Sequence, residues 1–153
     1  MQKRFCIFLL AVIAYGCAAF AQTGSAKNPV IYADVPDMSI IRVGDTYYMS
    51  STTMHIAPGV PIMKSKDLVN WEIVNYCYDI LEDMDELNLA NGKSTYGRGT
   101  WASCIRYHNN MYYVTTFAQT TGKTYIFSTR DIEKGPWEVS TFKPAYHLSL
   151  IHI

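Results

Sequence analysis

The sequence has no excess of either charge and few cysteines. Its 153 residues include 13 lysines and arginines and 13 aspartates and glutamates, so the formal net charge is zero. Without a basic excess there is little electrostatic attraction to nucleic acid or to an anionic membrane, and we expect neither as a partner. The 4 cysteines include no Cys-x-x-Cys pair, which excludes a disulfide-rich scaffold and a zinc ribbon.

Motifs for metals and phosphates are also missing. The segment 75–99 is rich in acidic residues, but it lacks the regular ligand spacing and the glycine of a calcium-binding loop. We interpret it as a solvated rim loop. Residues 96–99 read Tyr-Gly-Arg-Gly, without the lysine and the following helix of a phosphate-binding loop. We therefore expect no metal and no cofactor.

The first 21 residues have the pattern of a secretory signal peptide. A basic start precedes a short apolar run at residues 5–15, and an Ala-x-Ala ending places cleavage after Ala21. The apolar run is too short for a comfortable transmembrane helix. We expect a secreted or periplasmic protein with a linker at residues 22–27. The alternative is a lipoprotein anchored to a membrane through Cys17.

Beyond this signal only two cysteines remain, Cys77 and Cys104. In an oxidising compartment they could form one disulfide bridge. Free buried thiols are the other interpretation, because free cysteine behaves as a small hydrophobic residue. The sequence leaves both open.

Aromatic residues are abundant, with 12 tyrosines and 3 tryptophans, and this composition favours strands. An internal repeat is visible: Ile41 aligns with Ile105 and Asp67 with Asp131, both 64 residues apart. Each unit contains four short runs bounded by turn residues. The predicted strands are residues 39–43, 47–52, 60–65 and 71–76, followed by 102–107, 111–117, 124–128 and 137–142.

Four antiparallel strands per repeat are typical of a β-propeller blade, so we predict an all-β fold. A blade leaves its faces uncovered unless neighbours stack on both sides, and at least three repeats are usually needed. Because only two units are visible, we expect a fragment. Residues 148–153 resemble a translated sequencing-adapter tail, and we interpret them as foreign to the fold; a natural ending is the alternative.

The most informative stretch is residues 28–48. Here Pro36 and Asp37 precede Met-Ser-Ile, and a Gly-Asp turn and two tyrosines follow. This stretch resembles the opening of the five-bladed β-propeller of glycoside hydrolase family 43. Other matching pieces follow in the family's order, at residues 64–71, 99–102 and 135–137. The resemblance covers about residues 28–147 and implies that about the first two four-stranded blades of the propeller are present.

The resemblance implies an inverting glycosidase. Such enzymes hold two carboxyl groups about 6.5–9.5 Å apart, which leaves room for the attacking water. On the family pattern Asp37 is the general base. The general acid and a third aspartate that tunes its pKa would follow residue 147, so we expect this polypeptide to be inactive as written. The implied substrate is arabinose- or xylose-containing plant polysaccharide, cleaved by an α-L-arabinofuranosidase or a β-xylosidase.

Asp37 also has a purely structural interpretation, because an aspartate after proline at the start of a strand often caps a turn. The family pattern around it favours catalysis. Asp34 is the nearest competitor, and we interpret it as a loop acid.

Four further residues are candidates for sugar binding: Trp101, Ala102, Met54 and His55. The family's equivalent Trp-Ala lines the sugar pocket, whereas the alternative for Trp101 is a buried ring between blades. Met54 occupies a position where relatives often carry phenylalanine, although a lone methionine commonly packs in a core. His55 lies in a loop and could bond a sugar hydroxyl or be inert.

One residue departs from the family pattern. Ser103 stands where the family usually has proline after the alanine, which puts the local shape of that loop in question. A non-catalytic carbohydrate-binding propeller is the alternative function. The presence of Asp37 argues against it.

Overall fold

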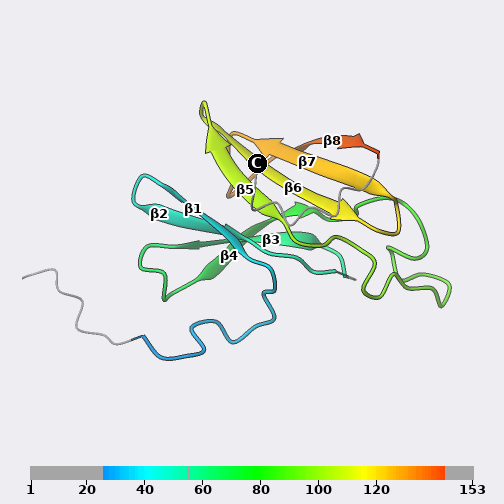
Figure 1. Ribbon diagram of the computed structural model, residues 1–153, viewed down its shortest axis with the longest axis horizontal. Coiled ribbons are helices and arrows are strands. Elements are labelled where there is room, and N and C mark those ends of the chain that lie inside the picture. The colour runs from blue at the N-terminus through cyan, green and yellow to red at the C-terminus, as the bar shows by residue number, and fades with distance from the viewer. Residues whose placement is uncertain (1–25, 55, 144–153) are drawn as a thin grey trace, which may run out of the picture.

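The computed structural model describes residues 26–54 and 56–143, which form two four-stranded antiparallel sheets (Figure 1). The sheets have the orders β1-β2-β3-β4 and β5-β6-β7-β8, so each is a simple meander. The strands are β1 (Ser39–Val43), β2 (Thr46–Ser50), β3 (Gly59–Ser65), β4 (Glu72–Tyr78), β5 (Cys104–His108), β6 (Met111–Ala118), β7 (Lys123–Thr129) and β8 (Glu138–Phe142). All eight predicted strands are confirmed, with ends within two residues of the prediction. We call the sheets blade one and blade two.

Within these described residues no segment is helical, and none is a helix able to cross a membrane. The expected signal peptide, the lipidation site at Cys17, the tail at 148–153 and His55 lie outside the described residues.

Two short hairpins set the register of the first two strands in each blade. Val43 pairs with Thr46 across Gly44-Asp45, and His108 pairs with Met111 across Asn109-Asn110. Gly44, Asn109 and Asn110 have φ values of 63°, 50° and 58°. Glycine and asparagine tolerate this left-handed conformation best, so the turn residues fit the tight reversals.

This register corrects the repeat predicted from the sequence. The hairpins are offset by 65 residues, since Ile40 pairs with Met49 and Ile105 pairs with Val114. The structural counterpart of Ile105 is therefore Ile40, and the predicted alignment with Ile41 is wrong by one residue. Alternate residues of a strand point to opposite faces, so one residue decides which face is buried.

The blades pack face to face through one apolar core. Blade one contributes Tyr48, Val60, Ile62 and Cys77, with Ile41 packed beside them; blade two contributes Ile105, Tyr112, Val114, Ala118, Tyr125, Phe127 and Ile132. Ile105 and Ile62 are both 0% exposed. The core fixes the relative position of the two innermost strands, β1 and β5, and thus of the segments that precede them.

Antiparallel pairing sorts the loops to the two ends of the blades. At one end β1 and β5 begin, and the loops 51–58, 79–103 and 119–122 lie at this same end, because Ser39 pairs with Ser50 and Gly59 with Tyr78. We call this the Asp37 end. The hairpin turns and the loops 66–71 and 130–137 form the opposite, hairpin end.

Candidate functional site

Asp37 lies two residues before β1, at the Asp37 end, with its side chain exposed to solvent. Its backbone has a φ of 50°, an uncommon conformation that aspartate tolerates better than most residues. Asp34 is also exposed, in the loop that leads to Pro36. Both candidate acids are therefore accessible, and Asp37 is the one fixed at the start of a strand.

Trp101 and Ala102 lie just before β5, in the neighbouring blade, and both are half-buried. Since Ser39 and Cys104 begin the equivalent strands, the counterpart of Asp37 in blade two is Ala102, and Trp101 lies one residue before it. The two segments thus reach the same end of adjacent innermost strands. Ser39 Oγ also accepts a 3.3 Å hydrogen bond from the Ile105 amide.

The Trp101 ring is held within blade two. Its indole Nε1 donates to the Gly97 carbonyl at 3.1 Å, its amide donates to the Phe117 carbonyl at 2.9 Å, and its ring centroid lies 5.7 Å from that of Phe117. Among the described residues, the buried cluster between the blades does not include Trp101. The predicted sugar contact of Trp101 stays a prediction.

A row of buried hydroxyl groups connects these two segments. Ser51 Oγ donates to the Pro36 carbonyl at 2.6 Å, and Thr52 Oγ1 donates to the Thr100 carbonyl. Ser103 Oγ lies 2.9 Å from Ser50 Oγ and 3.2 Å from the Ser51 carbonyl oxygen. The serine in the family's proline position therefore joins blade two to the end of β2. We did not predict these contacts, although the run of four hydroxyl residues at 50–53 was a visible signal.

Met54 lies beside this row, with a φ of 52° and an amide that donates to Thr52 Oγ1 at 3.2 Å. It is half-buried and lines a narrow pocket together with Tyr78 and Thr100. The structure thus places Met54 near the start of the Trp101 segment. His55 is outside the described residues, and its predicted role stays a prediction.

The acidic linker between the blades was predicted to be a solvated loop, but several of its side chains bond to other residues. Lys123 Nζ and the Tyr125 hydroxyl donate to Glu82 at 2.6 and 2.5 Å, while Lys93 pairs with Asp85 at 3.1 Å. Burial opposes ionisation of Glu82, but these donors outweigh it and lower the pKa of its carboxyl group. The linker is pinned to the start of β7, and its later part is bonded to the β6–β7 turn through the Thr120 amide and the Arg98 carbonyl at 2.8 Å.

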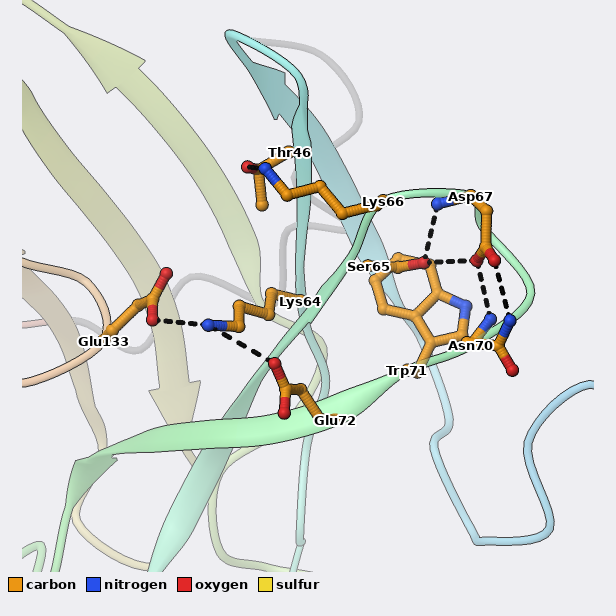
Figure 2. A pocket seen from close by; sticks show the side chains of 9 residues that line it. All are labelled: Thr46, Lys64, Ser65, Lys66, Asp67, Asn70, Trp71, Glu72 and Glu133. Atoms are coloured by element: carbon orange, nitrogen blue, oxygen red, sulfur yellow. Dashed lines mark hydrogen bonds and ion pairs between the residues drawn. The ribbon is translucent and has the colours of Figure 1, made fainter. Parts of the chain in front are cut away.

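A cavity of about 490 Å³ lies at the hairpin end, far from Asp37 along the strands (Figure 2). Its lining residues are Thr46, Lys64, Ser65, Lys66, Asp67, Asn70, Trp71, Glu72 and Glu133. Figure 2 shows that the charged groups are paired: Lys64 reaches Glu72 and Glu133, and Asp67 bonds Ser65 and Asn70. Hydrogen bonds from the Asn70 amide and side chain hold the pKa of Asp67 below its usual range. These contacts indicate a structural role for the residues that line this cavity.

No group of three His, Cys, Asp or Glu side chains converges on a metal position within residues 26–54 and 56–143. Cys77 and Cys104 are both buried and not bridged. Burial raises the pKa of the Cys77 thiol well above its usual value. The free-thiol interpretation is the one that the structure supports.

Comparison with known proteins finds relatives of this chain. Residues 26–147 match the family model described as Glycosyl hydrolases family 43. A "Beta-xylosidase" of Formosa agariphila is 40% identical over 116 residues, and a "Non-reducing end alpha-L-arabinofuranosidase" of Bacteroides ovatus is 33% identical over 141 residues. A solved structure described as "Bifunctional GH43-CE" from Bacteroides eggerthii is 69% identical, with a TM-score of 0.76 over 80% of this chain.

The chain is short relative to these proteins. The matches include 74% of it but 19% of the Formosa protein, and 90% of it but 26% of the Bacteroides ovatus protein. It covers 16% of the Bacteroides eggerthii chain.

Proposed function

Because the chain belongs to glycosyl hydrolase family 43, we propose that it supplies the base-carrying part of an exported inverting glycosidase. The family's fold is the five-bladed β-propeller, of which the two sheets are blades. The proposed substrate is plant polysaccharide with terminal arabinose or xylose, in line with the names of the relatives, a β-xylosidase and an α-L-arabinofuranosidase.

The placement of Asp37 is the observation that carries the proposal. Its carboxylate is exposed where two innermost strands begin side by side, and its neighbour Pro36 is bonded to buried Ser51. A general base must be accessible to water and fixed in direction, since catalysis depends on holding the reacting groups in one geometry. Asp37 meets both conditions, whereas exposed Asp34 lies further back in the loop.

The neighbouring groups suit the recognition of one sugar residue. Trp101 offers a flat apolar ring of the kind that packs on a sugar ring, with its indole nitrogen already bonded. Ala102 is the structural counterpart of Asp37 in blade two, and we propose that its small side chain leaves room for the sugar. We propose that Met54 and His55 border the same space from the β2–β3 loop.

A chimera tests this function. Residues 26–147 would replace the matching segment of the Bacteroides eggerthii protein, and the product would be assayed with 4-nitrophenyl β-D-xylopyranoside and 4-nitrophenyl α-L-arabinofuranoside beside the unmodified parent. We expect release of one of the two sugars, with the opposite anomeric configuration in early NMR spectra. Retention of configuration, or an active parent with an inactive chimera, would contradict the proposal.

The alternative is a carbohydrate-binding propeller without catalysis. It predicts that the chimera binds xylo- or arabino-oligosaccharides in calorimetry while releasing no sugar. The exposed, fixed carboxylate of Asp37 favours the enzyme, because binding alone does not require a charged group there.

A further inference from the structure

We propose that Ser51 and Thr52 are positioning residues that set the spacing between Asp37, the proposed base, and Trp101, whose ring is proposed to pack on the sugar. We call the Trp101 ring the sugar platform. This inference rests on the proposed function and deepens it. Ser51 bonds the carbonyl of Pro36, the residue before Asp37, and Thr52 bonds the carbonyl of Thr100, the residue before Trp101. Two consecutive residues therefore hold the segment that carries Asp37 and the segment that carries Trp101.

Ser51 and Thr52 follow β2 directly, and the Ser51 amide still donates to the Pro61 carbonyl at 3.3 Å. From this position Ser51 reaches the start of blade one while Thr52 reaches the start of blade two. Both residues are almost fully buried, at 1% and 2% exposure, so water cannot easily replace either bond. A buried carbonyl that loses its donor is costly, and the segment would shift to find another.

Other bonds reinforce each contact. Ser103 Oγ lies 3.2 Å from the Ser51 carbonyl oxygen, and the Tyr78 hydroxyl lies 2.9 Å from Thr100 Oγ1. On the far side of Trp101, Thr116 Oγ1 donates to the Trp101 carbonyl at 2.7 Å. Thr100 and Trp101 are thus held through both carbonyls, and the end of β2 is tied to blade two.

The two bonds should affect different kinetic constants. Loss of the Ser51 hydroxyl would let the Asp37 segment move, and misplacement of a catalytic group by about 1 Å can reduce the rate by up to about 10²-fold. Loss of the Thr52 hydroxyl would instead loosen the sugar platform. A binding contact made equally in the ground and transition states appears in KM, whereas a misplaced base appears in kcat.

The test uses the full-length chimera and substitutions at both positions. We expect Ser51→Ala to lower kcat at least about tenfold with KM within about twofold, and Thr52→Val to raise KM about tenfold with kcat within about threefold. Thr52→Ser keeps the hydroxyl and should restore KM. Ser51→Cys refills the space with a weak donor and should keep the low kcat, which separates the bond from the cavity.

Ser65→Ala is the matched control, because Ser65 is also a buried hydroxyl of blade one but lies at the hairpin end. It should lower the melting temperature and leave both kinetic constants within about twofold of the unmodified chimera. Equal effects of Ser51→Ala and Thr52→Val on kcat and KM would overturn the proposal. So would full activity in both.

Hydrogen–deuterium exchange provides a readout that does not require activity. Ser51→Ala should speed exchange of the amides at 37–39 and spare those at 100–102, and Thr52→Val should do the reverse. Unchanged exchange in both segments would refute the positioning role even in an active enzyme. If the parent releases sugar and the chimera does not, while exchange shifts as expected, the proposed function fails and the structural role stands.

Discussion

Glu133 in blade two forms a 2.7 Å ion pair with Lys64 in blade one, although 69 residues separate them in the chain. The same carboxylate accepts a 2.9 Å hydrogen bond from the Tyr48 hydroxyl, also in blade one. The Lys64 donor lowers the pKa of Glu133, and the pair raises the pKa of Lys64. Burial and the carboxylate together raise the pKa of Tyr48. These polar contacts therefore hold the two blades together at the hairpin end, beside the apolar core.

We expect Glu133→Gln to lower the free energy of unfolding by about 1 kcal/mol, because a charge-assisted bond becomes a neutral one in a half-exposed site. The pKa of Glu133 is lower in the folded state, so its contribution is complete above the unfolded value of 4.5 and is lost as the pH falls below it. Thermal melts of the chimera from pH 3 to 7 measure this. The variant should differ from the unmodified chimera at pH 7, and the difference should shrink as the pH falls below 4.5.

A second prediction concerns the linker that carries the Trp101 segment. Glu82→Gln removes the charge that Lys123 and the Tyr125 hydroxyl both contact. We expect amides 80–90 to exchange several-fold faster, because the acceptor that pins the loop is weakened. The pKa of Glu82 is also lowered in the folded state. In the unmodified chimera, exchange of these amides should therefore become faster as the pH falls below the unfolded value of 4.5.

Asp83→Asn is the control for this experiment. Asp83 is the next acidic residue of the linker, but it is exposed and bonds Asn88 within the same loop. Its replacement should leave the exchange rates unchanged. If both variants behaved alike, net charge rather than the Glu82 contacts would be the cause.

A third prediction follows from the face of blade one that points away from blade two. Ile40 and Leu68 are each 43% exposed, whereas their counterparts in blade two, Ile105 and Ile132, are buried at 0% and 1% against blade one. We expect residues 26–147 expressed alone to self-associate through this face. Leu68→Asn should weaken the association and also ease the backbone, because Leu68 has a φ of 64° that asparagine tolerates better.

Light scattering after size exclusion measures this association. Leu89→Asn provides the matched control, since Leu89 is exposed with a φ of 52° but lies in the linker. Equal effects of the two substitutions would attribute the association to general surface hydrophobicity.

Much of this fold was predictable because its local signals agree with its tertiary structure. Turn residues such as Gly44 and Asn109 fix the hairpins, and alternating apolar residues mark the strands between them. The predicted repeat alignment missed the register by one residue, although the turn residues Gly44 and Asn109 are themselves 65 residues apart. Isoleucine occupies both positions 40 and 41, and only packing against blade two decides that Ile41 faces the core.

The site was predictable in part. Family resemblance pointed to Asp37 and Trp101, and the structure places both at one end of adjacent strands. The run of four hydroxyl residues at 50–53 was visible, but the partners of Ser51 and Thr52 were not predictable, because serine and threonine after a strand also occur as turn residues. Their role depends on which carbonyl groups the folded chain brings within reach.

The final prediction tests the base directly in the chimera. Asp37→Asn keeps the size of the side chain and, because the carboxylate is exposed, should leave the melting temperature nearly unchanged. General-base catalysis contributes about 10²–10⁴-fold, so kcat should fall by that order while KM changes little. Asp34→Asn is the matched control and should stay within about threefold, since a loop acid away from the reacting atoms supplies no transition-state charge. Should Asp34→Asn abolish activity while Asp37→Asn is mild, the base would be Asp34, and the positioning role of Ser51 would lose its catalytic meaning because that residue holds the Asp37 segment.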